Sequence, residues 1–572
     1  MKPVRLPASA TLALPRWGLF VLCLVYILAG LIGRDPWKNL DDASGFGIMW
    51  TMAHGAPSDW LWPNIAGLHM PEEGPLAFWI GALCIKLFGW LLGDVLAARV
   101  ATIGFFLFGT LSVWYTTYLL GRRSEAQPLK LAFGGQPEAR DFGRTLADGA
   151  LLIYLGCMGL MVHSHSSTAE ALFVSLIVFS MYAAARLFEA HTLRTAMVLG
   201  LALGLLMLTR GWVVPLSLWL GLIVLATMRQ KSDAVRLLLV TLPVALAVGA
   251  SWLIACEFVQ PFNSSPATAW MSWNYRQLNL PSWDALRYLA KNGIWFGWPA
   301  WPFAGWAVYA WRKQFDALHI GLPLVFFTTL VLLALLNPYS EEALLLPMLP
   351  SLAILAAFGL PTMKRGAINA VDWFSVMGLT TLAAVIWLFW IATQTGFPAP
   401  LARNALKLVS GFQPEFHVIP VAIAALATAS WFLLVRWRVA RHPSVLWRAV
   451  VLSSGGVILC WLLIMTLWLP WANYKLSYAG VGQRIAEALP PAHQCVDSNV
   501  GPAQRASFAY FGHIPFARFN SPSCDLLLLQ DNNRDQRDAM LIQRSNERWL
   551  LIWEGRRASD RDERFRLYQR SN

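Results

Sequence analysis

Two adjacent carboxylates, Asp41 and Asp42, follow the first long apolar run of the chain. Three more acids, Asp59, Glu72 and Glu73, lie in the same tryptophan-rich stretch. A carboxylate can take a proton from an attacking hydroxyl or amine, while its neighbours hydrogen-bond sugar hydroxyls. Carboxylates beside aromatic rings therefore suit carbohydrate chemistry. The alternative is a solvated acidic loop between tryptophans of a membrane interface, and composition alone does not separate the two.

Charged residues interrupt the apolar pattern again further along. Glu170 opens an apolar run in HSHSSTAEALFV, 163–174, where a carboxylate can also serve only as a helix cap. Arg210 lies between two short apolar runs, and a cation there needs a phosphate or acidic partner unless it snorkels to the interface. Arg276 belongs to segment 270–299, where basic and aromatic residues alternate. That segment can hold a lipid phosphate, or lie on the membrane as an amphipathic helix without a ligand.

The composition places these residues in a polytopic membrane protein. Of 572 residues 57% are hydrophobic and only 13% are charged, whereas a soluble domain carries about a quarter charged residues. The 30 tryptophans fit aromatic belts, and the net charge of +13 fits basic cytoplasmic loops rather than a nucleic-acid partner. The N-terminal segment lacks a convincing cleavage site, so we expect a retained first span and not a signal peptide.

Apolar runs predict about thirteen transmembrane helices, because a span needs about 20 mostly apolar residues. They lie near 15–33, 95–121, 148–163, 170–188, 195–210, 211–228, 237–256, 294–311, 317–336, 344–361, 369–393, 417–436 and 447–469. The apolar stretch 75–93 is predicted to be a juxtamembrane or re-entrant helix, since a span there would send the basic cluster 122–144 outside. The N-terminus then faces the cytoplasm, and the acidic segment 34–74 faces outward.

A second domain is predicted over residues 471–572, after a membrane domain over 1–470. The sequence becomes polar there, and strand-like runs such as CDLLLLQD alternate with helix-like runs such as YAGVGQRIAEAL. This pattern predicts a small α/β domain outside the membrane. Cys495 and Cys524 fall in it and could form one disulfide in an oxidising compartment. The other five cysteines lie in apolar runs and suggest no metal site.

In their order these features resemble the polyprenyl-phosphate-sugar-dependent membrane glycosyltransferases of the GT-C class, the group of lipid A 4-amino-4-deoxy-L-arabinose transferase and the protein O-mannosyltransferases. Asp41–Asp42 matches an acidic pair after the first span, and SDWLWPNIAGLHMPEEGPLAFW, 58–79, resembles the motif G-D-W with E-K-P-P-L and Y-W. Glu170 matches a second outer acid. Leu208-Thr209-Arg210-Gly211 resembles L-T-K-G, and NPYSEEALLLPMLP, 337–350, keeps the spacing of L-P-x-x-P. The resemblance covers roughly residues 15–360.

The resemblance implies a GT-C fold and transfer of a sugar from a polyprenyl (undecaprenyl) phosphate donor. The acceptor would be lipid A, another glycan or a protein at the periplasmic face of a bacterial inner membrane. Asp41 would be the general base and Glu170 a second catalytic acid. The substrate-binding residues would be Asp42, Glu72, Glu73, Arg210 and Arg276. No cofactor is certain, although a divalent cation is compatible with these acids.

The chain also departs from the family pattern. Glu73 stands in place of a lysine, Glu341 and Glu342 stand where basic residues are expected, and Leu344 stands where a tyrosine is expected. These changes leave open an alternative, a non-catalytic polyprenyl-lipid-binding or accessory subunit on the same scaffold. A transporter is disfavoured, because the charged residues cluster in outer loops and not along a path through the bilayer.

Overall fold

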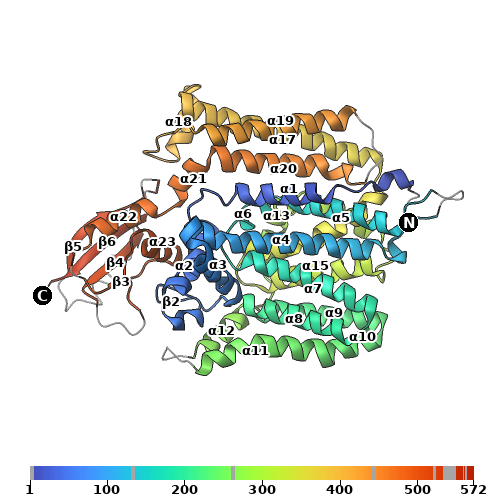
Figure 1. Ribbon diagram of the computed structural model, residues 1–572, viewed down its shortest axis with the longest axis horizontal. Coiled ribbons are helices and arrows are strands. Elements are labelled where there is room, and N and C mark those ends of the chain that lie inside the picture. The colour runs from blue at the N-terminus through green and yellow to red at the C-terminus, as the bar shows by residue number, and fades with distance from the viewer. Residues whose placement is uncertain are drawn as a thin grey trace.

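A bundle of long helices with a small sheet-containing domain at one end makes up the protein (Figure 1). The structure is a computed structural model that describes residues 6–130, 135–258, 265–440, 446–491, 493–518, 524–532, 549–557, 559–560 and 563–571. The helices of the first half are α1 (Arg16–Ala29), α2 (Asp42–His54), α3 (Leu76–Leu92), α4 (Asp94–Gly121), α5 (Ala139–Leu155), α6 (Leu160–His163), α7 (Glu170–Ala190), α8 (Leu193–Thr209), α9 (Val213–Arg229), α10 (Lys231–Arg236), α11 (Leu242–Phe258), α12 (Pro266–Arg276) and α13 (Trp283–Phe296). The later helices are α14 (Ala300–Ala310), α15 (Leu318–Leu336), α16 (Leu349–Gly359), α17 (Arg365–Thr395), α18 (Ala399–Lys407), α19 (Val418–Ala440), α20 (Arg448–Leu467), α21 (Leu469–Leu476), α22 (Ala479–Ala488) and α23 (Pro502–Phe511).

The helices confirm a polytopic membrane fold. In the described part of the chain, eight helical segments are long and apolar enough to cross a membrane. They are Asp94–Gly121, Glu170–Ala190, Lys231–Phe258, Leu318–Leu336, Glu342–Thr362, Gly366–Thr395, Val418–Arg438 and Val450–Leu467. Four shorter apolar helices, α1, α3, α8 and α9, lie beside them. The protein is therefore a helical membrane protein.

The predicted number of thirteen spans is not confirmed. The predicted spans near 148–163 and 294–311 coincide with α5, α6 and α14, which belong neither to the eight long segments nor to the four shorter apolar helices. Charged residues in the first turns of α5 dilute its hydropathy, and α14 is only 11 residues long. The predicted juxtamembrane stretch 75–93 is α3, which lies with α2 at the end of the bundle next to the C-terminal domain (Figure 1).

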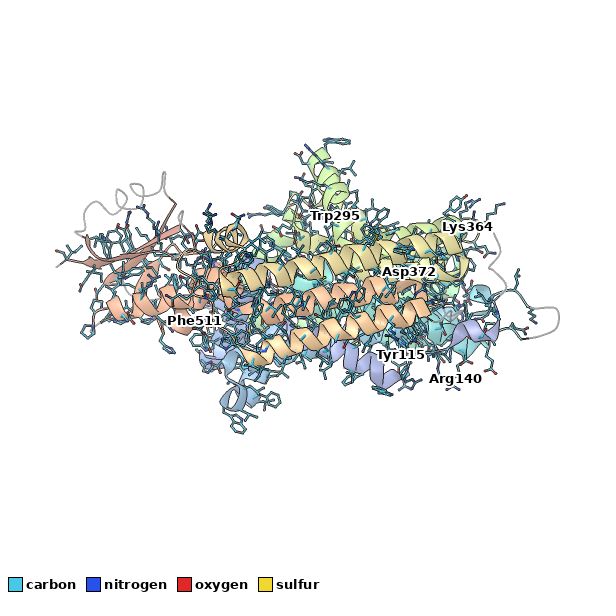
Figure 2. All side chains as sticks on the ribbon, turned by 90° about the horizontal axis from the view of Figure 1, so that it is seen from above. Tyr115, Arg140, Trp295, Lys364, Asp372 and Phe511 are labelled. Atoms are coloured by element: carbon cyan, nitrogen blue, oxygen red, sulfur yellow. A yellow bond between two sulfur atoms is a disulfide. The ribbon has the colours of Figure 1, made fainter. Side chains whose placement is uncertain are left out.

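The bundle has a buried centre and two flanks. At the centre α4 packs against α3, α5 and α7, and α14 packs against α16. Helices α17 to α20 form one flank beside α1, and α8 to α11 form the other (Figure 1). Arg140, from the basic cluster 122–144, and Lys364, just before α17, lie at the end of the bundle away from Phe511 of the C-terminal domain (Figure 2). Basic loops and the C-terminal domain thus occupy opposite ends.

The C-terminal domain is built on a four-stranded sheet. Its strands are β3 (Val496–Ser498), β4 (Leu526–Asn532), β5 (Trp549–Gly555) and β6 (Glu563–Arg570). Their order is β3-β4-β6-β5, in which β3 and β4 are parallel and the other pairs antiparallel. Phe508 of α23 packs with Leu528 and Phe565 of the sheet in the core of the domain. The small α/β domain predicted from the sequence is therefore present, while its boundary after residue 470, which α21 crosses, stays a prediction.

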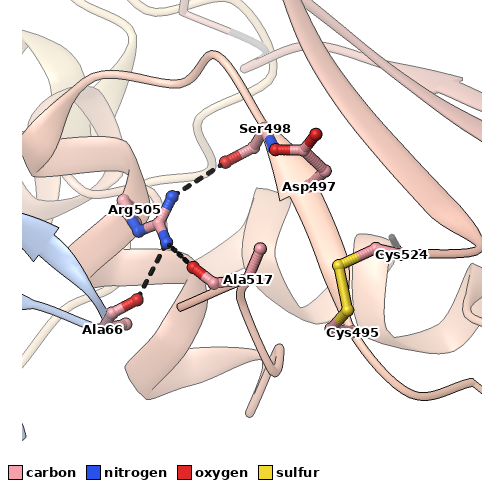
Figure 3. Close-up of a disulfide and its surroundings, with 7 residues drawn as sticks. All are labelled: Ala66, Cys495, Asp497, Ser498, Arg505, Ala517 and Cys524. Atoms are coloured by element: carbon pink, nitrogen blue, oxygen red, sulfur yellow. Dashed lines mark hydrogen bonds between the residues drawn. A yellow bond between two sulfur atoms is a disulfide. The ribbon is translucent and has the colours of Figure 1, made fainter. Parts of the chain in front are cut away.

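Arg505 fastens this domain to the first loop of the membrane domain. Its buried guanidinium donates from Nε to the carbonyl of Ile65 (3.1 Å) and from Nη2 to the carbonyls of Ala66 (2.8 Å) and Ala517 (2.7 Å), as Figure 3 shows for the Nη2 bonds. Residues 65 and 66 belong to the hairpin of β1 (Asn64–Ile65) and β2 (Leu68–His69), which leads directly to Glu72 and Glu73. The domain thus holds a loop that carries predicted site residues.

A disulfide joins Cys495 and Cys524, and the other five cysteines are free thiols (Figure 3). The two bonded residues precede β3 and β4, so the bond ties the starts of the parallel pair together. It closes a loop over a sequence separation of 29 residues, and a loop of that length stabilises a domain by about 3 to 4 kcal/mol through the unfolded chain.

Removing this disulfide should destabilise the C-terminal domain. We expect the double variant Cys495→Ala/Cys524→Ala to lose about 3 kcal/mol of domain stability, measured as faster proteolysis of the domain in increasing urea. Alkylation of the denatured, unreduced wild type should label the five free cysteines and leave the bonded pair unlabelled. Cys84→Ala, which removes a thiol from α3, is the matched control. Seven labelled cysteines without reductant would contradict the assignment.

Candidate active site

A cavity of about 390 Å³ opens where the membrane helices meet the C-terminal domain. Its walls come from the start of α2, segment 70–73, residues 210–211, the end of α12 and the loop 337–347 between α15 and α16. Pro502, the first residue of α23, adds a wall from the C-terminal domain. The predicted site residues that line it are Asp41, Glu72, Glu73, Arg210 and Arg276. Segments far apart in the sequence therefore converge here.

Asp41 presents an exposed carboxylate to the cavity from a strained turn. Leu40 and Asp41 have φ of 56° and 54°, a left-handed conformation that residues other than glycine adopt rarely. Such strain persists only where the surroundings enforce it. Desolvation in the cavity and the carboxylate of Glu170 raise the pKa of Asp41, partly offset by Arg210. A carboxylate with a raised pKa is a stronger base.

Asp42, the next residue, is held in place by its own contacts and so helps to fix this turn. It does not line the cavity that contains Asp41. Its Oδ2 lies 2.9 Å from Arg34 Nη2 and 3.5 Å from Arg99 Nη2, and its Oδ1 accepts the Ser167 N–H at 2.7 Å. The side chain is 1% exposed. Burial opposes ionisation, but the two guanidinium groups outweigh it and hold the pKa of Asp42 below its usual value. The neighbouring carboxylates thus have different surroundings, and Asp42 has no free oxygen to offer a substrate.

Gly45 allows the close approach that the hydrogen bond between Ser167 and Asp42 requires. A Cβ on Gly45 of α2 would lie 2.0 Å from the Ser167 carbonyl oxygen, so any larger residue would push the loop between α6 and α7 away from α2. That loop leads into Glu170 at the start of α7. The close approach therefore places Glu170 beside the Asp41 turn.

Glu170 lies behind the cavity and pairs with Arg210. Arg210 Nη1 donates to Glu170 Oε1 at 3.1 Å, and His163 Nδ1 lies 3.5 Å from Glu170 Oε2. Burial would lower the pKa of Arg210, but the carboxylates of Glu73 and Glu170 outweigh it and raise the pKa. Arg210 is thus a permanent cation whose side chain stays 25% exposed toward the cavity. The sequence predicts a phosphate or an acidic partner for this arginine, and in the structure Glu170 is an acidic partner.

Glu73 is a carboxyl group that lines the cavity. Its Oε2 is buried and has no hydrogen-bond partner among the described residues. Burial raises the pKa of Glu73 to about 8, despite the opposing effect of Arg210. At neutral pH this side chain is therefore mostly protonated. Glu73, which stands where the resemblance implies a lysine, therefore adds little negative charge to the cavity under those conditions.

Arg276 is exposed at the end of α12 and lines the cavity beside Asn274. Asn274 is buried, accepts the Trp212 N–H through Oδ1 at 3.0 Å and donates from Nδ2 to the Trp270 carbonyl at 2.9 Å. These bonds hold α12 against the segment that carries Arg210. The two predicted phosphate ligands therefore share one cavity.

Two residues of the site were not singled out from the sequence. His163 contacts Glu170 and, through Nε2, Glu342 Oε2 at 3.4 Å. Tyr339 lines the cavity, as does Leu344, which stands where a tyrosine is expected. For His163 the available sequence signal was a histidine in the polar stretch before Glu170. For Tyr339 it was an aromatic residue within NPYSEEA.

No group of three or more His, Cys, Asp or Glu side chains within the described ranges is arranged to hold a metal ion. Glu170 is paired with Arg210, and Glu73 is mostly protonated near neutral pH. These two carboxyl groups therefore do not suit a divalent cation.

A scan with protein-family models and a search of curated protein sequences find no match to this chain. Solved structures do match. ArnT from Cupriavidus metallidurans bound to undecaprenyl phosphate superimposes with a TM-score of 0.66 at 15% sequence identity, over 96% of this chain and 98% of that chain. Apo ArnT from the same organism gives a TM-score of 0.64 over the same shares.

This chain has the ArnT fold. The fold implied by the motif resemblance, a GT-C membrane domain followed by a small C-terminal domain, is thereby confirmed over nearly the whole length of both ArnT and this chain. The archaeal oligosaccharyltransferase AglB from Archaeoglobus fulgidus, in complex with an inhibitory peptide and a dolichol-phosphate, matches with a TM-score of 0.42 at 11% identity, over 86% of this chain and 64% of that chain.

The different surroundings of Asp41 and Asp42 predict different effects of the same substitution. Asp42→Asn leaves two buried guanidinium groups without their anion, which should cost about 3 to 5 kcal/mol and lower the melting temperature. Asp41→Asn should change stability by less than about 0.5 kcal/mol, because the side chain is exposed and asparagine tolerates the left-handed turn. Melting curves of the two detergent-solubilised variants test this, and equal losses would contradict it.

The raised pKa of Glu73 predicts that the stability of the protein depends on pH. The folded protein holds this proton up to about pH 8, whereas an unfolded glutamate loses it near about pH 4.3. Between those values the folded state binds more protons, so wild-type stability falls as the pH rises. The melting temperature of Glu73→Gln should therefore fall less than that of the wild type between about pH 5 and about pH 8. Glu138→Gln, at an exposed glutamate before α5, should behave like the wild type.

Proposed function

We propose that the protein is an inverting membrane glycosyltransferase that moves a sugar from a polyprenyl-phosphate donor, such as an undecaprenyl-phosphate sugar, to a cell-envelope acceptor. The supporting observation is one cavity, on the ArnT fold, that contains the base-like Asp41 together with the cations Arg210 and Arg276. Its volume of about 390 Å³ falls in the range of about 300 to 1,000 Å³ that small-molecule sites occupy.

The two arginines are suited to the donor phosphate. Guanidinium groups bind phosphate through charge-assisted hydrogen bonds, and both side chains face the cavity. The Arg210 side chain is partly exposed to the cavity although it pairs with Glu170. A phosphate bound there would use the hydrogen-bond donors of Arg210 that face the cavity. The ArnT structure that shares this fold contains undecaprenyl phosphate. Glu73 stands where the resemblance implies a lysine. Because it is mostly protonated near neutral pH, it repels a phosphate less than an ionised glutamate at this position would.

The transfer follows from these positions. The acceptor hydroxyl or amine attacks the anomeric carbon from the face opposite the phosphate, and Asp41 takes its proton. The new bond forms as the bond between the anomeric carbon and the phosphate oxygen breaks, so the configuration inverts. The polyprenyl phosphate leaves with the bonding electron pair, and Arg210 and Arg276 stabilise its growing charge.

The other acids have supporting roles in this proposal. Glu170 holds Arg210, while Glu72, whose pKa burial raises, faces the cavity and is available to sugar hydroxyls. Asp42 acts by fixing the turn that presents Asp41. Residues 1–470 are the transferase domain and 471–572 an outer domain, in the inner membrane of a bacterium with the N-terminus in the cytoplasm. The acceptor is lipid A, another glycan or a protein at the periplasmic face.

Replacing the proposed base should stop transfer without stopping donor binding. We expect Asp41→Asn to lower product by about 100-fold or more, because general-base catalysis contributes about 10² to 10⁴. The measurement is mass spectrometry of envelope lipids, glycans and proteins from cells that lack the gene and carry wild type or variant on a plasmid. The hexose or pentose that disappears with the gene names the donor sugar and its acceptor.

Asp284→Asn is the matched control, since Asp284 is an exposed acid of α13 that does not line the cavity. It should restore the product fully. Normal product from Asp41→Asn would remove Asp41 as the base. Wild-type protein that binds undecaprenyl phosphate but transfers no sugar to any envelope component would instead favour the accessory subunit, which the glutamate in place of lysine at position 73 makes the second candidate.

A further inference from the structure

His163 lies between carboxylates from two other parts of the chain. Its Nδ1 is 3.5 Å from Glu170 Oε2, and its Nε2 is 3.4 Å from Glu342 Oε2. The imidazole is only 4% exposed and packs edge-on against Phe296 of α13, with ring centres 5.5 Å apart. One buried ring therefore connects the start of α7 to the loop that forms a wall of the Asp41 cavity.

Only the protonated ring suits both neighbours. A neutral imidazole has one N–H donor and one acceptor nitrogen, whereas an imidazolium donates from both nitrogens. Ionised carboxylates accept and do not donate. A neutral His163 would thus turn a lone pair toward Glu170 or toward Glu342, and would lose that contact.

The contact with Glu170 affects Arg210. Arg210 donates to Oε1 of Glu170, and His163 faces Oε2, so the two cations share one carboxylate. Because His163 neutralises part of the charge of Glu170, Arg210 can make one hydrogen bond to it and keep its other donors for a ligand. Without the imidazolium charge, Glu170 attracts Arg210 more strongly and the cavity wall becomes more negative. Both changes oppose the binding of a phosphate.

We propose that His163 is a positioning residue for the phosphate site: its imidazolium holds Glu170 and Glu342 together, and its deprotonation weakens the binding of the lipid phosphate at Arg210. This inference rests on the proposed function. It adds a pH-sensitive element to the site, since loss of one proton weakens the contact with Glu342 of the loop 337–347 and at the same time strengthens the pairing of Arg210 with Glu170.

Other titratable groups surround this contact. They are Glu170 on α7, Glu341 and Glu342 in the loop, Arg210 after α8, Asp41 before α2 and Tyr288 on α13, whose pKa is raised by burial and by both loop glutamates. Burial alone would lower the pKa of His163, but Glu170 and then Glu342 outweigh it and the pKa lies above its usual value. Glu73 titrates in the same region, at about 8, so a variant of His163 is needed to separate the two.

The test is binding of undecaprenyl phosphate to the full-length protein in nanodiscs as a function of pH. Wild-type affinity should fall as the pH rises above about 6.5, the ordinary pKa of histidine, through the raised value. His163→Gln should bind about threefold to tenfold more weakly at the acidic end and show a shallower profile, because it lacks the charge and keeps only the Glu73 titration. Undecaprenol, which has no phosphate, should show neither effect.

A second variant keeps the proposal testable if His163→Gln does not fold. Glu342→Gln changes a residue whose side chain is 57% exposed, and it removes one of the two charges that raise the pKa of His163. The midpoint of the binding profile should therefore move to lower pH. Glu341→Gln, its neighbour without a contact to His163 among those described, should move the midpoint less.

The possible outcomes are distinct. Identical profiles for the wild type, His163→Gln and Glu342→Gln would assign the pH dependence to Glu73 and overturn the role of His163. Folded wild-type protein that does not bind undecaprenyl phosphate at any pH would overturn the proposed function, and this inference with it. Binding of undecaprenyl phosphate by the wild type, with a pH profile that becomes shallower in His163→Gln, supports both.

Discussion

The site depends on a single buried carboxylate, that of Asp42. It pairs with Arg34 and Arg99 and accepts the backbone N–H of Ser167, so it connects the segment before α2, helix α4 and the loop before α7. Each of these charges would be costly to bury alone, and the ion pairs offset part of that cost. Because Asp42 is fixed inside this cluster, the preceding residue is forced outward in a left-handed turn. The exposure of Asp41 in the cavity is therefore a result of the burial of Asp42.

Helix α2 connects the Asp42 cluster to the C-terminal domain. One end of α2 is anchored through Asp42, and further along a Cβ on Gly47 would lie 2.5 Å from Cβ of Ala506 in α23. Phe46 packs edge-on against Tyr510, also of α23. Arg505 holds the hairpin that leads to Glu72 and Glu73. The C-terminal domain is thus packed against the same helix and loop that present the acids of the cavity.

Much of this arrangement could be predicted from the sequence, and the remainder could not for physical reasons. Apolar runs and loop charges predicted a membrane bundle with an outer α/β domain, and motif order predicted that Asp41, Glu73 and Arg210 meet. Adjacency in sequence did not reveal that Asp41 and Asp42 have different surroundings, because backbone dihedrals of a turn decide it. The contacts of His163 were not predicted, since its second partner, Glu342, lies 179 residues away.

Pro502 gives the cavity a wall that belongs to the C-terminal domain. During synthesis the membrane helices emerge first, and this wall is added only after nearly nine-tenths of the 572 residues have been made. A chain interrupted after α20 would lack this wall, and its cavity would be open on that side. The cavity is therefore complete only after the C-terminal domain has been made and has folded against the membrane helices.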